Sequence, residues 1–240
     1  MHYGRIDAAT DREFTEKSVR LLTLHIKTFV EAQGRCIIGL SGGSTPKPIY
    51  EAMGKEKTIA WNKIWFFLVD DRYVPAEHAD SNQKLVRETL LRHLSIPKHQ
   101  IVFPHTALPL KECVADYDAR IGSMLEDGPV DIVTLGLGDD GHIASLFPPL
   151  SDDALDEDRN VIHTTTPSAR SGQAARFAVH DRISLALPIL AAAKISVFFL
   201  KGEAKLKVWN QMTDTEEFDP KRWPAHAVLK SGRATAVMGP

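Results

Sequence analysis

The sequence predicts an α/β protein with a doubly wound, mostly parallel β-sheet and helices on both faces of that sheet. Short apolar runs typical of buried strands alternate with longer segments in which apolar residues recur at helical spacing. No low-complexity tract or internal repeat interrupts this alternation. Repeated strand–helix units of this kind favour a parallel sheet covered by helices. We expect a single domain spanning residues 1–240.

Composition and charge narrow the class of protein. Of the 240 residues, 43% are hydrophobic and 25% are charged, which is ordinary for a globular enzyme. The formal net charge of −2 gives no electrostatic basis for a nucleic-acid or membrane partner. Cys36 and Cys113 form no metal-binding spacing or disulfide framework, which fits a reducing compartment. Residues 1–15 lack an apolar signal region, and no apolar run approaches about 18 residues, so we expect a cytoplasmic protein.

The first half of the chain shows the alternation most clearly. Apolar residues at helical spacing, among them Phe14, Leu22 and Ile26, predict a helix over residues 11–33 that ends at Gly34. Further helices are predicted after Pro46 and over residues 81–94 and 111–125. Buried strands are predicted over residues 35–40, 64–69, 100–103 and 130–137.

After residue 148 the pattern is weaker. We interpret residues 149–160 as an acidic loop and residues 149–180 together as an insertion or lid. The remaining expected elements are short strands over 161–165, 176–179 and 183–187, a helical turn over 188–193, a strong strand over 194–200, a helix over 203–212 and a last strand over 234–238.

The most informative stretch is residues 135–148, which read LGLGDDGHIASLFP. Glycines directly after a predicted strand allow a sharp turn and a close approach by a ligand. In open α/β sheets, ligands bind beyond the carboxyl ends of the strands, so His142 is a candidate general base with Asp140 two residues before it. The alternative is a tight turn with solvated aspartates and a histidine satisfied by a carbonyl group.

A second glycine-rich loop follows the strand at 35–40. Residues 39–43 (GLSGG) match the G-x-S-x-G pattern of serine hydrolases, in which Ser41 would be the nucleophile. However, in that arrangement Pro46 would fall inside the following helix, at a cost of about 3 kcal/mol. A helix that begins at Pro46, with Thr45 as its N-cap, avoids this cost. The loop then resembles a phosphate cradle made of Gly42, Gly43, Ser44 and Thr45. A purely structural turn and a serine nucleophile remain as alternatives.

Charged residues also follow the strand at 64–69. Because Asp70, Asp71 and Arg72 come directly after a strand, we expect them on the same rim of the sheet as His142. An arginine there can stabilise a developing oxyanion or hold a carboxylate. The alternative is an arginine paired with its own neighbouring aspartates. Ser81 or Asn82 is the expected N-cap of the next helix.

Further cations could contact a phosphate from this rim. Lys201 and Lys205 lie at the start of the helix after strand 194–200, although a solvated lysine is the more ordinary interpretation. Arg170, Arg176 and Arg182 lie in the weakly patterned segment, and their spacing does not distinguish among them. Asp139, Asp140, His142 and Asp70 lack the spacing of known metal sites, so we expect no metal.

Five blocks in this order resemble the 6-phosphogluconolactonases, a family that shares its fold with glucosamine-6-phosphate deaminases. These blocks are residues 41–46 (SGGSTP), 70–75 (DDRYVP) with 80–82 (DSN), 136–148, 182–185 (RISL) and 201–205 (KGEAK). They extend over most of the chain, and the block at 136–148 is the most specific of them. The resemblance implies a Rossmann-like fold and hydrolysis of 6-phosphoglucono-1,5-lactone in the pentose phosphate pathway.

The sequence departs from the family pattern at one position. The family usually has Asp-Glu-Arg where this chain has Asp70, Asp71 and Arg72, so the role of Asp71 is open. The related deaminases usually have Glu where this chain has Phe147 and Tyr where it has Arg72. A phenylalanine cannot ionise, and both differences favour a lactonase over a deaminase.

The chemistry of a δ-lactone indicates which groups the expected active site needs. An activated ester needs a positioned water, a base and donors for the carbonyl oxygen, and it needs no cofactor or metal. We expect His142 to act as the base, Asp140 to orient it and Arg72 to stabilise the oxyanion. The expected substrate-binding residues are Gly42, Gly43, Ser44, Thr45, Asp70, Lys205 and Arg182. A non-catalytic sugar-phosphate sensor is a third possibility, although no DNA-binding segment is visible. We expect a monomer or a homodimer with a sugar-phosphate lactone as its ligand.

Overall fold

The computed structural model describes residues 2–167 and 178–240. Within these residues a seven-stranded sheet forms the centre of the protein, with all neighbouring strands parallel and in the order β1–β10–β9–β6–β2–β3–β5. Its strands are β1 (Gly4–Asp7), β2 (Cys36–Leu40), β3 (Ile64–Leu68), β5 (Ile101–Val102), β6 (Ile132–Leu135), β9 (Ile195–Lys201) and β10 (Ala234–Gly239). The sheet is parallel, as the alternating strands and helices of the sequence predict.

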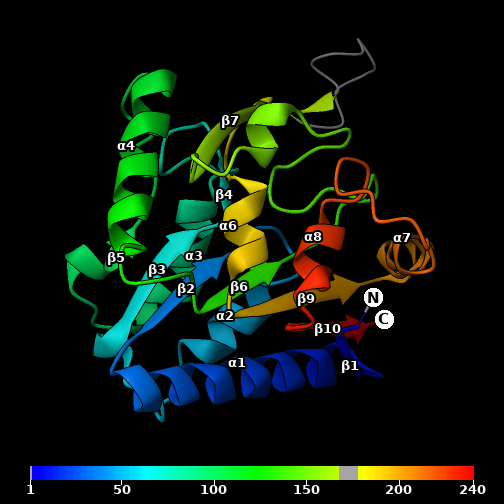
Figure 1. Ribbon diagram of the computed structural model, residues 1–240. Helices are drawn as coiled ribbons and strands as arrows, with labels where there is room; N and C mark the ends of the chain where they lie inside the picture. The colour runs from blue at the N-terminus through cyan, green and yellow to red at the C-terminus, as the bar shows by residue number, and fades with distance from the viewer. Residues whose placement is uncertain (1, 168–177) are drawn as a thin grey trace.

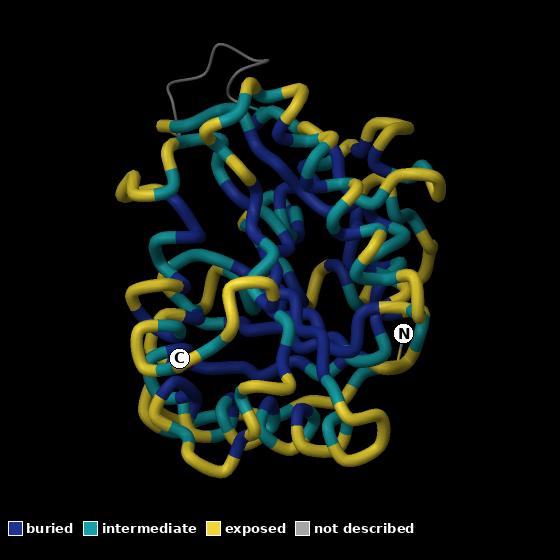
Figure 2. The backbone as a smooth tube through the Cα atoms, turned by 90° about the vertical axis from the view of Figure 1, so that its left-hand side faces the viewer, coloured by how far each residue is buried: buried dark blue, intermediate teal, exposed yellow. Residues whose placement is uncertain are grey.

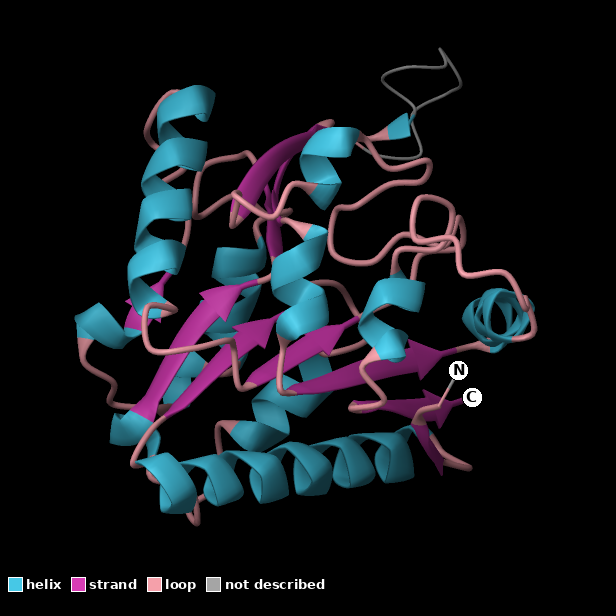
Figure 3. Ribbon diagram, viewed as in Figure 1, coloured by secondary structure: helices cyan, strands magenta, loops and turns pink. Residues whose placement is uncertain are grey.

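Helices cover both faces of this sheet (Figures 1 and 3). One face packs against α1 (Asp11–Gln33), α2 (Lys47–Met53) and α3 (Asn82–Thr89). The other face packs against α4 (Leu110–Met124), α6 (Leu187–Ala192), α7 (Glu203–Thr213) and α8 (Ala225–Lys230). The doubly wound arrangement predicted from the sequence is therefore confirmed.

The central strands are apolar at consecutive positions because both of their faces are buried. In β9, Val197 and Phe199 pack into the layer of α1 to α3, whereas Phe198 and Leu200 pack into the layer of α4 to α8. This is the two-residue side-chain period of a strand that has a core on each side. Figure 2 shows the resulting distribution, with buried chain in the centre and exposed chain in the outer loops.

The long helix α1 has the predicted boundaries because local signals fix both of its ends. The side chain of Thr10 accepts a hydrogen bond from the backbone of Glu13, and the Glu13 carboxylate accepts one from the backbone of Ala9. These two bonds satisfy backbone donors that the first turn leaves open. Gly34 ends the helix with a φ of 77°, a left-handed conformation that glycine adopts without strain.

A second sheet lies above the carboxyl ends of the parallel strands (Figure 1). It consists of β4 (Asp70–Arg72), β8 (Asp181–Leu185) and β7 (Val161–Thr165), which pair antiparallel in that order. The sequence predicts β7 and, displaced by two residues, β8. It does not predict β4, because three consecutive charged residues show no apolar alternation.

Several predicted boundaries are wrong. Thr45 is not an N-cap: α2 begins at Lys47, and no side chain caps its first turn. Helix α3 ends at Thr89 and is followed by a separate 3₁₀ turn, so the predicted helix over 81–94 is too long. Within the acidic loop the chain makes a 3₁₀ turn at Asp152–Leu155.

The predicted strand over 176–179 lies partly outside the described residues. Residues 176 and 177 lie outside the described residues, and residues 178–180 are not in a strand. Two elements are also absent from the prediction: β1, a short edge strand beside β10, and α8. None of the helices in the described part of the chain combines the length and hydrophobicity that crossing a membrane requires.

The order of the strands locates the position where a ligand is expected. From β2 the chain proceeds to β3 and β5 on one side, then returns to β6 and proceeds to β9 and β10 on the other side. The connections that leave the neighbouring strands β2 and β6 therefore run to opposite sides of the sheet. Ligands of open α/β sheets bind beyond the carboxyl ends of the strands at such a point.

Candidate active site

A cavity of about 290 Å³ opens at the carboxyl ends of β2 and β6. The loop after β2, the turn after β6 and the small antiparallel sheet form its walls. Of the residues predicted to form the site, the cavity is lined by Gly42, Gly43, Asp70, Arg72, His142, Arg182 and Lys205. Segments far apart in the sequence thus meet at the position that the strand order indicates.

The turn that carries His142 is shaped by glycine. The backbone N–H of Gly138 donates to the carbonyl of His142 at 2.8 Å, and Gly141 has a φ of 91°. An added Cβ on Gly138 would lie 2.1 Å from Nδ1 of His142. Because no real Cβ approaches an atom that closely, the position of the imidazole depends on the absence of a side chain at Gly138.

Asp140 holds the ring of His142 from within the same turn. Its Oδ1 lies 2.5 Å from Nδ1 of His142. Burial alone would raise the pKa of Asp140, but its hydrogen bond with His142 and the charge of His142 outweigh that effect and lower the pKa to about 2. Asp140 is therefore ionised near neutral pH and accepts a hydrogen bond from the Nδ1–H group of His142.

Phe147 packs beside the same imidazole. The two ring centroids are 4.6 Å apart and the rings are inclined by 49°. Phe147 is the residue that distinguishes this chain from the deaminase pattern, so an aromatic ring occupies a position where an ionisable carboxyl group is expected in a deaminase.

The segment before α8 packs against the turn that carries His142. The guanidinium of Arg222 donates to the backbone oxygen of Asp140 at 3.0 Å and lies 3.8 Å above the ring of Trp223. An added Cβ on Gly141 would lie 2.5 Å from that ring. Trp223 and Arg222 thus pack against the turn, and the sequence pattern indicates no role for either.

The loop after β2 is fixed by buried hydroxyl groups. Thr134 accepts from the backbone N–H of Ser41 at 2.9 Å, and the Tyr50 hydroxyl donates to the Ser41 carbonyl at 2.8 Å. Burial raises the pKa of Tyr50 to about 12, so it remains a neutral donor. The hydroxyl of Ser41 itself lies 3.3 Å from that of Thr134, which is not a base. This arrangement favours a structural role for Ser41 over a nucleophilic one.

Of the predicted phosphate cradle, the first two residues line the cavity. Gly42 and Gly43 line the cavity, and Gly43 has a φ of 94°, which turns the backbone sharply. Ser44 is exposed and Thr45 is half-buried, and neither is among the residues that line the cavity.

Asp70 and Asp71 point in different directions, as alternate residues of a strand do. Asp70 lines the cavity and accepts from the hydroxyl of Ser145 at 2.6 Å. Asp71 is fully buried and accepts from the backbone N–H groups of Asn82 at 2.7 Å and Arg72 at 2.8 Å. Burial raises the pKa of Asp71 to about 6, although these bonds partly oppose the effect. The residue that departs from the family pattern therefore fixes the start of α3 instead of facing the cavity.

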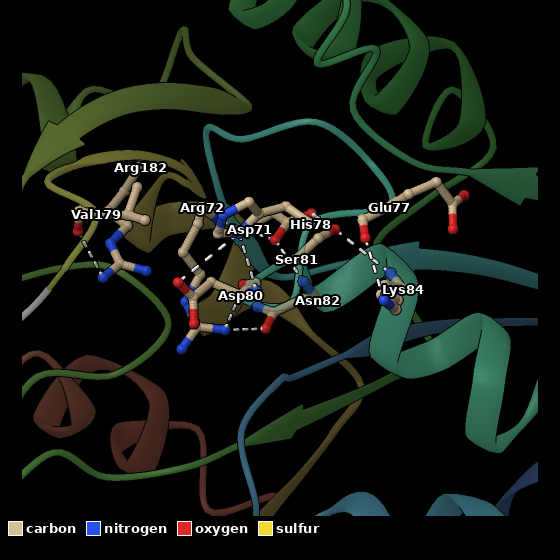
Figure 4. A network of polar contacts seen from close by, with 10 residues as sticks. All are labelled: Asp71, Arg72, Glu77, His78, Asp80, Ser81, Asn82, Lys84, Val179 and Arg182. Carbon is tan, nitrogen blue, oxygen red and sulfur yellow. Dashed lines mark hydrogen bonds and ion pairs between the residues drawn. The ribbon is translucent and has the colours of Figure 1, made fainter.

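Arg72 is held by α3 and the loop before it. Its Nη1 donates to the side-chain oxygen of Asn82 and, at 3.2 Å, to the backbone oxygen of Asp80 (Figure 4). These partners differ from the neighbouring aspartate carboxylates that the alternative interpretation assigned to Arg72. Asn82 lines the cavity and is 1% exposed, although the sequence analysis assigns it no role at the site beyond a helix cap within the block at 80–82.

Two more cations complete the cavity. Burial lowers the pKa of Arg182, and the charge of Arg72 lowers it further. Burial also lowers the pKa of Lys205, which the charge of Asp139 opposes. Of the three candidate arginines, Arg182 lines the cavity, while Arg170 and Arg176 lie outside the described residues. Lys201 instead forms an ion pair with Asp11 at 2.8 Å, away from the site.

The side chains described here offer no clear metal centre. Among residues 2–167 and 178–240, no group of three or more His, Cys, Asp or Glu side chains is arranged to hold a metal ion. The cavity is lined by the imidazole of His142, two guanidinium groups, an ammonium group and the carboxylates of Asp70 and Asp139, while Asp140 holds the imidazole from outside the lining. Such a set can move a proton and bind an anion.

Comparison with known proteins points to the same family that the sequence motifs resemble. The family model described as "Glucosamine-6-phosphate isomerases/6-phosphogluconolactonase" matches residues 9–237. A probable 6-phosphogluconolactonase of Dictyostelium discoideum is 40% identical over 222 residues, which cover 91% of this chain and 90% of the relative. The 6-phosphogluconolactonase of Pseudomonas aeruginosa is 34% identical, with 86% and 82% of the two chains covered. A solved structure of 6-phosphogluconolactonase from Plasmodium vivax superposes with a TM-score of 0.87 at 28% identity, covering 100% of this chain and 91% of the other.

Proposed function

This chain belongs to the family of glucosamine-6-phosphate isomerases and 6-phosphogluconolactonases, and we propose that it hydrolyses 6-phosphoglucono-1,5-lactone to 6-phosphogluconate. This is a reaction of the pentose phosphate pathway. The observation that carries the proposal is that His142, hydrogen-bonded to Asp140, lines a cavity that is also lined by three cationic side chains. The pair supplies a base, and the cations supply the partners for a phosphate and an oxyanion.

His142 acts as the general base. Because ionised Asp140 accepts a hydrogen bond from the Nδ1–H group, the lone pair of the neutral imidazole resides on Nε2. Nε2 removes a proton from a water molecule as that water attacks C1 of the lactone. The carboxylate also stabilises the imidazolium that forms. Asp140 therefore orients the ring and does not itself accept the proton of the water.

Arg72 stabilises the negative charge that develops on the carbonyl oxygen. Attack at C1 converts a neutral carbonyl into a tetrahedral oxyanion. When this species collapses, the C1–O5 bond breaks, the ring oxygen takes the proton held by His142, and the new carboxylic acid ionises to a carboxylate. A fixed guanidinium is complementary to both anions. Its contribution is greatest in the transition state, where the charge appears.

The opposite end of the substrate carries the phosphate. The backbone N–H groups of Gly42 and Gly43, with Lys205 and Arg182, bind this dianion. Asp70 accepts hydrogen bonds from sugar hydroxyl groups. Binding at the phosphate holds C1 near His142 and can lower the barrier by several kcal/mol. Phosphorylated lactones should therefore be preferred over unphosphorylated ones.

Hydrolysis of freshly prepared 6-phosphogluconolactone tests this proposal. The rate of acid release is compared with the spontaneous rate, with glucono-1,5-lactone and glucosamine 6-phosphate assayed in parallel. We expect fast turnover of the phosphorylated lactone, much slower turnover of the unphosphorylated lactone and no ammonia from glucosamine 6-phosphate. Release of ammonia would instead assign the site to deaminase chemistry, in spite of Phe147. An acid release rate equal to the spontaneous rate would contradict any lactonase function.

A further inference from the structure

We propose that Asn82 is a positioning residue, whose side-chain amide fixes the guanidinium of Arg72 at the cavity. The proposal rests on the lactonase function proposed above. It concerns a residue that the sequence indicates as a helix cap and as part of the family-like block at 80–82, with no role at the site assigned to it. Figure 4 shows the relevant residues, with the Asn82 amide beside the Arg72 guanidinium at the start of α3.

The amide of Asn82 has one orientation that satisfies both of its ends. Its Oδ1 accepts from Nη1 of Arg72, and its Nδ2 donates to the backbone oxygen of Asp70 at 2.9 Å. A flipped amide would direct NH₂ at a guanidinium and its oxygen at a carbonyl, and both contacts would be repulsive. Because Asn82 is 1% exposed, water cannot replace these partners easily.

The backbone beneath this amide is also fixed. The N–H of Asn82 donates to buried Asp71 at 2.7 Å, and the hydroxyl of Ser81 accepts from the N–H of Lys84 as the N-cap of α3. Asn82 is thus the first residue of a helix whose start is held by a carboxylate. An amide mounted on this point has little freedom to move.

Gly42 restricts the amide from the opposite side. An added Cβ on Gly42 would lie 1.9 Å from Oδ1 of Asn82, so the glycine loop packs directly against the amide. Asn82 therefore connects the loop that would bind the phosphate to the arginine that would bind the oxyanion. The absence of a side chain at Gly42 makes this contact possible.

Arg72 requires such a restraint because another cation lies directly across from it. Arg72 and Arg182 are register partners on the antiparallel strands β4 and β8, and both line the cavity. Like charges in this position repel. Among the described contacts, Asn82 and the carbonyl of Asp80 both bind Nη1, which leaves Nε and Nη2 for a substrate oxygen.

A double-mutant cycle tests whether Asn82 acts through Arg72. We expect Asn82→Ala to lower kcat at least about tenfold and to change KM by less than about threefold. The reason is that the guanidinium of Arg72 loses its orientation, whereas the residues that bind the phosphate are unchanged. In the Arg72→Ala background, the same change should alter kcat by less than about twofold. Asn82→Asp keeps an acceptor for Arg72 but replaces the donor to the Asp70 carbonyl with an oxygen, so it should recover part of the lost kcat.

Chemical rescue gives a readout that a purely structural role would not affect. Methylguanidinium at tens of millimolar should restore part of the activity of Arg72→Ala and should fail to restore that of the double variant. Ser81→Ala is the matched control, since it removes the N-cap of α3 and does not contact Arg72. It should lower the Tm and leave kcat within about twofold of the wild type.

The outcomes separate this proposal from the proposed function. If the wild type hydrolyses the lactone but the Asn82 and Arg72 effects are additive, the positioning role is wrong and the lactonase function stands. The same conclusion follows if Asn82→Ala lowers the Tm without lowering kcat. A wild type without lactonase activity would overturn both proposals.

Discussion

Two walls of the cavity present their key side chains in different ways. The turn that carries His142 is built from glycines, and the added atoms of any side chain at Gly138 would displace the imidazole. The wall that carries Arg72 is built from buried polar side chains, with Asp71 and Asn82 each making several hydrogen bonds. The first wall depends on the absence of atoms and the second on the presence of hydrogen-bond partners.

This difference predicts different sensitivities. Added bulk should damage the His142 wall while leaving the fold intact, because the turn lies at the end of a strand that is already fixed by the sheet. Changes of charge or pH should damage the Arg72 wall, because its centre is a buried carboxylate with a raised pKa. Four substitutions examine the comparison, from the largest expected effect to the smallest.

The largest effect should come from His142→Ala. Removal of a general base typically costs a factor of about 10² to 10⁴ in rate. We expect kcat to fall by that amount while KM changes little, because the phosphate site remains. Steady-state kinetics above the spontaneous rate would measure the effect, and circular dichroism would show whether the fold is retained. A kcat close to that of the wild type would remove His142 from the role of base.

Gly138→Ala tests whether the His142 wall depends on empty space. The new Cβ would lie 2.1 Å from Nδ1 of His142 and 2.7 Å from Oδ1 of Asp140, so both side chains must move from their present positions. A displacement of about 1 Å in a catalytic group can cost about 10²-fold in rate, and we expect a loss of kcat of that order with little change in Tm. The comparison variant is Gly136→Ala, where an added Cβ meets nothing within 4 Å. Equal kcat values for the two variants would show that steric crowding is not the cause.

Asp71→Asn tests the Arg72 wall through the dependence of stability on pH. The pKa of Asp71 is about 6 in the folded protein, against an ordinary value of 3.8. Between about pH 4 and pH 6 the folded state keeps a proton that the unfolded state has lost. Stability therefore falls as pH rises through this window, by up to about 3 kcal/mol. The asparagine variant lacks this contribution.

Urea unfolding of wild type and Asp71→Asn at pH 4.5, 5.5 and 7.0 measures this effect. The free energy of unfolding of the variant relative to that of the wild type should increase as pH rises. The comparison cancels the titration of the other carboxyl groups, which are common to both proteins. A difference that does not vary with pH would mean that Asp71 titrates as an ordinary carboxyl group and that burial does not dominate its chemistry.

The same contrast explains which features the sequence could predict. The boundaries of α1 follow from Thr10 and Gly34, which act on backbone groups within a few residues. The central strands follow from apolar runs, since a strand buried on both faces needs them. His142 and Asp140 are two residues apart, so their pairing is also a local property of the sequence.

The sequence places Arg72 on the rim of the sheet, but the contacts that hold it could not be predicted because they are not local. Strand β4 is entirely charged, and its pairing partner β8 begins more than a hundred residues later in the chain. The role of Asn82 depends on Gly42, Asp70 and Arg72, which approach one another only after the sheet has formed. A local pattern therefore indicates Asn82 as part of a helix start and nothing more.

The smallest effect should come from Arg222→Ala, which removes external support from the glycine turn. Arg222 donates to the backbone oxygen of Asp140 and stacks on Trp223, which in turn packs on Gly141. A hydrogen bond of this kind contributes about 0.5–1.5 kcal/mol, so we expect kcat to fall about two- to tenfold. Lys221→Ala is the control, because the Lys221 side chain forms an exposed ion pair with Asp152 at 2.9 Å and should leave kcat unchanged. Steady-state kinetics of the two variants measure the effect. Equal kcat values would mean that the glycine turn holds His142 without help from Arg222. The His142 wall would then depend on its glycines alone, and it would differ from the Arg72 wall even more than we propose.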